Sequence, residues 1–127
     1  MQNVISTEKA PGAIGPYSQA IEIDNLVLTS GQLGIDPATG AFAEGGVQAQ
    51  TAQSLENVKA ILATKGLTLD DVIKTTVFIK DMNDFGKVNE VYAKYICGDK
   101  LPARSCVEVA RLPKDGLVEI EVIALKK

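Results

Sequence analysis

Only two stretches of the chain carry the repeat of an amphipathic helix, and this limits the fold more than any other feature. In each stretch mostly apolar side chains recur at steps of three or four residues, which places them along one side of a helix. They are Val47, Thr51, Leu55, Val58 and Leu62 in the first stretch, and Phe85, Val88, Tyr92, Tyr95 and Ile96 in the second. Gly66 stands where a left-handed stop of the first helix belongs, because glycine adopts that conformation without steric cost, and Gly98 can end the second helix.

Five further stretches favour strands, and their order predicts an α+β fold. Residues 17–23 and 26–29 flank a two-residue turn at Asp24-Asn25, which is typical of a hairpin. Apolar and β-branched side chains also dominate residues 72–79, 105–109 and 118–125. The order is hairpin, helix, strand, helix, strand, strand, with no repeat or linker. We therefore expect one domain over residues 1–127, with one mixed sheet and both helices on one of its faces.

The sheet face away from the helices is expected to be half apolar. In the last strand Val118, Ile120, Val122 and Ala124 form one side, and Glu119, Glu121, Ile123 and Leu125 form the other. Strand 72–79 divides into Ile73, Thr75, Val77 and Ile79 on one side and Val72, Lys74, Thr76 and Phe78 on the other. A half-apolar face is costly to leave in water, so we expect a homo-oligomer in which another subunit covers it. The alternative is a monomer with an ordinary mottled surface.

Charge and hydropathy argue against nucleic acid and membranes as partners. The net charge is −3 and the 13 Lys and Arg residues are scattered, so a phosphate backbone would be repelled. No apolar run approaches the roughly 18 residues needed to cross a bilayer. The N-terminus lacks the pattern of a secretory signal, so the expected location is cytoplasmic.

The chain contains no histidine, which excludes many kinds of active site. Without it there is no Ser-His-Asp triad, no Cys-His dyad and almost no usual zinc or iron site. The two cysteines, Cys97 and Cys106, are too few for a disulfide scaffold or a cysteine-rich zinc site. Acid–base chemistry must therefore fall to other side chains or to water, and no metal is expected.

Arg104 and Glu119 are the strongest candidates for chemistry. Pro102 marks the start of a strand that Arg104 opens, and Glu119 lies in the following strand. If these strands are neighbours, both side chains lie with Cys106 on the sheet face away from the helices. A guanidinium holds a small carboxylate through two bonds, and a nearby carboxylate can polarise a water as general base. The alternative is a structural ion pair across the strands.

Five other residues have a structural and a functional interpretation. Cys106 is either a nucleophile or, as free cysteine more often is, a partly buried wall residue. Tyr17 follows a turn, and Ser30 and Gly31 end a strand, so all three also fit ordinary turn chemistry. Asn89 lies on the second helix and is most simply a solvated position.

Several runs together resemble the RidA (YjgF) family of reactive-intermediate deaminases, formerly called endoribonuclease L-PSP. The most specific runs are Pro102-Ala103-Arg104-Ser105-Cys106-Val107 and Val118-Glu119-Ile120. Others are Ile14-Gly15-Pro16-Tyr17, Thr29-Ser30-Gly31-Gln32, Ser54-Leu55-Glu56-Asn57-Val58 and Lys74-Thr75-Thr76-Val77-Phe78. The resemblance implies a chorismate-mutase-like α+β fold and a homotrimer with active sites at the subunit interfaces. It also implies that no metal or cofactor is needed.

The resemblance further implies a hydrolase of the 2-iminobutanoate/2-iminopropanoate deaminase type. Such enzymes convert 2-imino acids, tautomers of enamines released by pyridoxal-phosphate-dependent dehydratases, to 2-oxo acids and ammonia. Carried over position by position, Arg104 clamps the substrate carboxylate and Glu119 holds the attacking water. The other substrate-binding residues are Tyr17 near the imine nitrogen, Ser30, Gly31, Asn89 and Cys106.

Two other functions ascribed to such proteins stay open at this point. One is an endoribonuclease that inhibits translation, against which the acidic charge and the missing histidine count. The other is a non-catalytic module, either a binder of small carboxylates or a holdase chaperone. Two departures from the family pattern bear on substrate preference. The segment at residues 97–101 is slightly short, and residues 33–35 lack a proline often found there.

Overall fold

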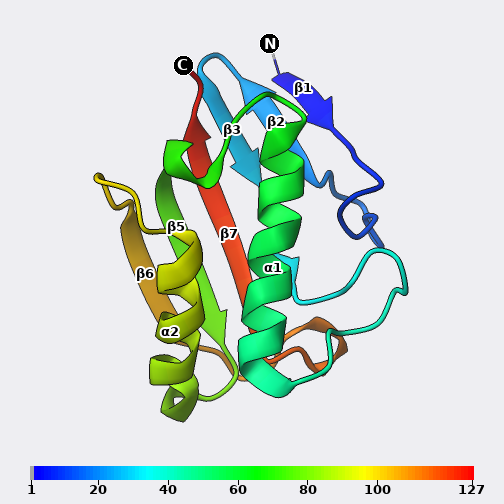
Figure 1. Ribbon diagram of the computed structural model, residues 1–127. Helices are drawn as coiled ribbons and strands as arrows, with labels where there is room; N and C mark the ends of the chain where they lie inside the picture. The colour runs from blue at the N-terminus through cyan, green and yellow to red at the C-terminus, as the bar shows by residue number, and fades with distance from the viewer. Residues whose placement is uncertain (1) are drawn as a thin grey trace.

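Within residues 2–127, which the computed structural model describes, two helices lie on one face of a single sheet (Figure 1). The helices are α1 (Gly46–Ala63) and α2 (Phe85–Tyr95). The strands are β1 (Gln2–Ile5), β2 (Ala20–Ile23), β3 (Leu26–Thr29), β4 (Gln32–Leu33), β5 (Val72–Ile79), β6 (Ala103–Glu108) and β7 (Val118–Leu125). The α+β class and both helices expected from the sequence are confirmed.

The order of strands in the sheet differs from their order in the chain. It is β1-β2-β3-β7-β5-β6, and β4 pairs with β7 beyond the end of β3. β6 runs parallel to β5, with α2 as the crossover between them, and the other pairs are antiparallel. The predicted hairpin is β2–β3, where Asp24 adopts the left-handed conformation with φ 50°. β5 therefore lies between β6 and β7, which are not neighbours.

The core lies between α1 and the sheet. On α1 the side chains of Leu55, Val58, Ile61 and Leu62 are completely buried. The strands contribute Val27, Val77, Ile79, Val118 and Ile120, each also completely buried. Removing one such side chain from water contributes about 1.5–3 kcal/mol. The apolar side chains that recur every three or four residues on α1 thus pack against those that recur every two residues on β5 and β7.

One end of β5 departs from the predicted division of its side chains. A register shift lies between Val72 and Lys74 in the pairing with β7. As a result Val72 is 3% exposed and faces the core, whereas Ile73 is 44% exposed. The predicted division therefore holds for residues 74–79 and is wrong for the first two, because an irregularity of one residue exchanges the sheet faces.

The face of the sheet opposite the helices, called here the open face, is half apolar. Its side chains alternate along each strand with those of the core. Apolar members are Ile21, Leu28, Phe78, Val107, Ile123 and Leu125, all partly or largely exposed. Val107 and Leu125 are 44% and 42% exposed. No helix of residues 2–127 covers this face, as the alternation predicted (Figure 1).

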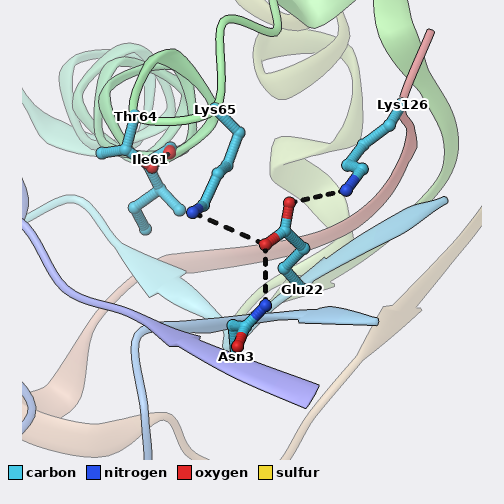
Figure 2. Close-up of polar contacts among 6 residues, drawn as sticks. All are labelled: Asn3, Glu22, Ile61, Thr64, Lys65 and Lys126. Carbon is cyan, nitrogen blue, oxygen red and sulfur yellow. Dashed lines mark hydrogen bonds and ion pairs between the residues drawn. The ribbon is translucent and has the colours of Figure 1, made fainter. Parts of the chain in front are cut away.

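A polar cluster joins the two ends of the chain at the β1–β2 edge (Figure 2). The Glu22 carboxylate accepts hydrogen bonds from Lys126 Nζ at 2.7 Å and Asn3 Nδ2 at 3.2 Å. Lys65 Nζ, just beyond α1, lies 3.5 Å from the same carboxylate. The hydrogen bond from Lys126 contributes most to lowering the pKa of Glu22 from 4.5 to about 2. This cluster fastens β2 to the end of β7 and to the turn after α1.

Candidate functional site

A pocket of about 300 Å³ opens beside Glu119 on the open face. The segment between β1 and β2 contributes Pro11, Gly12, Ile14 and Tyr17, called the wall below. The turn between β3 and β4 contributes Ser30 and Gly31, called the floor. The lining residues are Pro11, Gly12, Ile14, Tyr17, Gln19, Ser30, Gly31, Gln32, Leu33, Pro113 and Glu119. This hollow is called the Glu119 pocket below. It brings together four predicted site residues: Glu119, Tyr17, Ser30 and Gly31.

The position of Glu119 follows from the alternation of β7. Val118 and Ile120 are completely buried on the helix side, so Glu119 points to the open face. There its strand partners are Leu33 of β4 and Phe78 of β5. Burial raises the pKa of Glu119 above 4.5, and the negative charge of Glu121 raises it further. A carboxylate in this setting is a stronger base than one in water and can also hold a proton.

Gly31 lies directly against the Glu119 carboxyl group. A Cβ atom at position 31 would lie 2.6 Å from Cδ of Glu119 and 2.8 Å from Oε1. The φ angle of Gly31 is not positive, so its backbone conformation does not require glycine. Glycine is needed here because any side chain would displace the carboxylate.

Ser30 and Tyr17 are fixed by local hydrogen bonds. Ser30 Oγ donates to the backbone oxygen of Ser18 at 2.6 Å. The Tyr17 side chain is 50% exposed, and its hydroxyl accepts from the Ile14 N–H at 3.4 Å. The Tyr17 ring therefore stays accessible at the pocket mouth, while the Ser30 hydroxyl donates its proton to the backbone of Ser18 and not into the pocket.

Helix α1 holds the floor strand through buried polar side chains. Ser54 Oγ donates a hydrogen bond to the backbone oxygen of Gln32 at 2.6 Å. Asn57 Nδ2 donates to the oxygens of Leu33 and Ile35 at 3.1 and 2.9 Å. Ser54 and Asn57 are completely buried. These bonds satisfy backbone groups that a two-residue strand leaves unpaired, and they fix β4 beside Glu119.

Arg104 lies in a second hollow, between β6 and α2. Its NH1 group donates to Asn89 Oδ1 at 2.8 Å. The guanidinium carbon lies 4.8 Å from the centroid of the Tyr92 ring and 5.6 Å from that of Phe85. The hollow is lined by Asn89, Tyr92, Ala93, Ile96, Leu101, Pro102 and Arg104, and is called the Arg104 pocket below. Aromatic faces stabilise the cation while leaving its planar edge free for an anion.

Arg104 and Glu119 lie on opposite faces of the sheet, so the predicted meeting of the two within one chain is wrong. Arg104 is paired with Thr75 of β5, which faces the core, whereas Glu119 is paired with Phe78, which faces away. Strand β5 also separates them. The alternative of a cross-strand ion pair is wrong for the same reason. Among residues 2–127, none of the ion pairs involves either side chain.

Cys106 lies on the same face as Arg104 and is half-buried. Its strand partner is Val77, on the helix side. Burial raises the pKa of the Cys106 thiol, and the neighbouring Arg104 charge offsets this only in part. The neutral thiol is therefore favoured, which supports the wall interpretation over the nucleophile. The placement of Cys106 on the face away from the helices is wrong.

The sequence interpretation missed two residues that line these pockets, Tyr92 and Gln19, and one that contacts Arg104 without lining the pocket, Phe85. Tyr92 and Phe85 belong to the apolar stripe that predicted α2, but their rings also stack on Arg104. Their spacing of seven residues placed both on one helix face, and this was the available signal. Gln19 lines the Glu119 pocket and is 4% exposed. No sequence pattern marks it, because its partners are backbone atoms.

Among residues 2–127 no three His, Cys, Asp or Glu side chains are grouped so that they could hold a metal ion. Across the same residues no helix has the length and apolar character needed to cross a membrane.

These features define a small α+β protein with an acidic pocket and a basic pocket on opposite faces of its sheet. A family model described as Endoribonuclease L-PSP matches residues 7–126, and the chain belongs to this family, the RidA (YjgF) family that the sequence resembled. The chain is 58% identical to a RutC family protein of Pyrococcus horikoshii, with all of both chains covered. It is 55% identical to the 2-iminobutanoate/2-iminopropanoate deaminase of Salmonella typhimurium, again over all of both chains.

The solved structures agree with the sequence relatives. Escherichia coli TdcF with bound serine matches with a TM-score of 0.93 and 50% identity, covering 98% of this chain and 99% of that one. Yeast Mmf1 matches with a TM-score of 0.94 and 42% identity over all of both chains. The fold is therefore that of the family from end to end.

Proposed function

We propose that the protein is a 2-iminobutanoate/2-iminopropanoate deaminase. The observation that carries this proposal is a base with a raised pKa, Glu119, in one pocket and, in another, an anion-binding group, Arg104, that forms no ion pair within residues 2–127. Relatives that are 51–55% identical over the full chain carry this name. TdcF was solved with serine, a small molecule that has a carboxylate and an amino group.

In this proposal each active site is completed by a second copy of the chain. One copy cannot bring Arg104 to Glu119, because the sheet separates them. A neighbour whose Arg104 pocket faces the Glu119 pocket would supply the missing charge and cover part of the half-apolar open face. Contacts of this head-to-tail kind close into a ring, and we propose a homotrimer with three sites.

The substrate enters with its carboxylate toward Arg104. The guanidinium offers two parallel N–H groups to a carboxylate. Asn89, which accepts one N–H of Arg104, sets the orientation of that fork. Holding the substrate by its carboxylate leaves the imine carbon beside the Glu119 pocket of the neighbouring copy.

Hydrolysis then needs one water and one proton carrier. Glu119 accepts a proton from the water as the water oxygen attacks the imine carbon, which gives a carbinolamine. With the substrate bound as an iminium, the same carboxyl group passes that proton to the amine nitrogen, so the C–N bond breaks and ammonia leaves. The hydroxyl proton of the carbinolamine then returns to the Glu119 carboxylate, which releases the 2-oxo acid. A carboxyl group whose pKa is raised is suited to these transfers, and positioning supplies much of the remaining acceleration.

The other pocket residues take supporting roles in this proposal. Tyr17 lies at the pocket mouth, close to the path of the imine nitrogen. Ser30 and Gly31 form the floor against the Glu119 carboxylate. Cys106 forms a wall and offers its backbone N–H. The two cysteines are free thiols, which supports a reducing, cytoplasmic location.

A coupled assay tests the proposal. A dehydratase generates 2-aminocrotonate in the presence of semicarbazide, which traps the imine, and the protein is then added. Trapping should become slower as the protein converts the imine to 2-oxobutanoate. Arg104→Ala should abolish this effect, while Arg111→Ala, a surface arginine that is paired with Asp115, should not.

The rival functions predict different results in the same experiment. A carboxylate-binding module or a holdase would leave the trapping rate unchanged. A ribonuclease would cleave RNA and lose that activity in the Arg104 variant. The Glu119 pocket weighs against RNA as substrate, because Glu119 and Glu121 would repel a phosphate.

A further inference from the structure

The wall of the Glu119 pocket consists of backbone without regular secondary structure. Between β1 and β2 the chain contributes Pro11, Gly12, Ile14 and Tyr17 to the pocket. Ile14 and Tyr17 are 68% and 50% exposed, so packing does little to hold them. A loop with few buried contacts needs another restraint to keep one position relative to the floor.

That restraint is the side-chain amide of Gln19. Its oxygen accepts from the Thr7 N–H at 2.6 Å. Its nitrogen lies 3.1 Å, 3.2 Å and 2.7 Å from the backbone oxygens of Thr7, Ala10 and Pro11. The side chain is 4% exposed, so these bonds are shielded from water. One amide therefore holds backbone groups across the first half of the wall.

The backbone of the same residue is bonded to the pocket floor. The backbone oxygen of Gln19 accepts a hydrogen bond from the Ser30 N–H at 2.8 Å. Ser30 is followed by Gly31, which touches the Glu119 carboxyl group. Gln19 thus joins the wall, through its side chain, to the floor that positions the carboxylate.

We infer that Gln19 is a positioning residue that sets the distance between the pocket wall and Glu119. This inference rests on the proposed function only for the identity of the substrate. In the proposed function the wall contacts the substrate and takes no part in proton transfer. Its displacement should therefore raise KM much more than it lowers kcat.

The test replaces Gln19 with glutamate, which has the same shape. Gln19→Glu keeps the acceptor for Thr7 but places a second oxygen against three backbone oxygens, so residues 7–17 should be released. Gln50→Glu is the matched control. Gln50 is 8% exposed, and its side-chain oxygen accepts from the Leu117 N–H. That bond survives the change, and both variants add a charge at a buried position.

Three readouts are compared in the intact protein. Hydrogen exchange should accelerate in residues 7–17 of Gln19→Glu and stay unchanged elsewhere. KM for 2-iminobutanoate should rise about tenfold with kcat within about twofold of wild type, as expected for lost binding contacts. The affinity for 2-oxobutanoate, measured by titration without turnover, should fall by a similar factor. Gln50→Glu should change none of these.

Each failure has its own meaning. Faster exchange with unchanged KM and unchanged 2-oxobutanoate affinity would overturn the inference, as would unchanged exchange. If wild type does not hydrolyse the imine at all, the proposed function fails. Hydrogen exchange and the affinity for 2-oxobutanoate then still test the role of Gln19. If Gln19→Glu does not fold, Gln19→Asn replaces it. This variant keeps the amide but withdraws it by one methylene, and it should give an intermediate rise in KM; a wild-type KM would contradict the inference.

Discussion

The two pockets are built on different principles. In the Glu119 pocket the acidic group is set by backbone: a glycine that leaves room for it, a two-residue strand, and a loop held by one amide. In the Arg104 pocket the basic group is set by side chains of a helix, with two aromatic rings stacked on it and one amide oxygen bonded to it. The first pocket is therefore sensitive to small shifts of the main chain. The second should tolerate such shifts and respond to changes of ring or charge.

The largest expected effect comes from mixing two inactive variants. Arg104→Ala and Glu119→Gln should each lose nearly all activity, because each removes one charge from every site. A working site needs an intact Arg104 from one copy and an intact Glu119 from the neighbouring copy. When the two variants are mixed at random in equal amounts, each condition is met with a chance of about one half. About a quarter of wild-type activity should therefore return in a head-to-tail ring.

The mixing experiment is measured by the trapping assay after joint refolding or coexpression. Two preparations of the same variant, mixed in the same way, give the baseline. If the mixture stays inactive while forming normal oligomers, Arg104 of one copy and Glu119 of another do not share an active site.

Gly31→Ala should lower kcat by about 10- to 100-fold, the scale expected when a catalytic group is displaced by up to about 1 Å. The added methyl group would lie 2.6 Å from Cδ of Glu119, so the carboxylate must move. KM should change little, because the Arg104 pocket is untouched. Gly86→Ala on α2, where a Cβ would meet nothing within 4 Å, is the control. Wild-type kcat in Gly31→Ala would show that the carboxylate position is not critical.

Phe85→Leu should raise KM by about two- to fivefold and leave kcat nearly unchanged. The substitution keeps an apolar side chain but removes a ring that lies 5.6 Å from the guanidinium, a contact worth about 0.5–1 kcal/mol at an exposed site. Steady-state kinetics measure the effect. A fall in kcat without a change in KM would contradict the assignment of Arg104 to substrate binding.

The smallest expected effect is a shift in the pH profile. Glu119 acts as a base when ionised, so kcat/KM should fall as pH drops through its raised pKa, which lies above 4.5. Burial is the larger cause of that rise and the charge of Glu121 the smaller. Glu121→Gln should therefore move the acidic limb to lower pH by a fraction of a unit.

In the proposed ring, Arg104 of the neighbouring copy would act on the pKa of Glu119 in the opposite direction, so the informative quantity is the difference between wild type and Glu121→Gln. Both profiles are measured in the same buffers and at the same ionic strength, because surface charges are screened by salt. A limb that moves to higher pH would contradict the sign of the Glu121 contribution.

The helices, the hairpin and the two faces of β7 could be predicted because each follows from a local repeat. The alternation of Val118 to Leu125 depends only on the geometry of one strand. The relation of Arg104 to Glu119 could not be predicted in this way. It depends on β5 lying between β6 and β7, and adjacent segments of a chain need not be adjacent in a sheet.

The shift at Val72 and the anchor at Gln19 were missed for related reasons. A bulge changes the face of a residue without any change in composition. The partners of Gln19 are backbone atoms, which every residue carries, so no pairing of side-chain types marks the contact. Both features arise from three-dimensional arrangement that a one-dimensional pattern does not contain.

In the proposed ring, the separation of Arg104 from Glu119 by a sheet would make catalysis depend on protein concentration. We expect that dilution which dissociates this ring would leave each copy folded with only half of an active site. Specific activity should then fall with dilution and return on concentration, while the circular dichroism of the chain stays constant. A cell that made little of this protein would lose more activity than the drop in its amount alone accounts for.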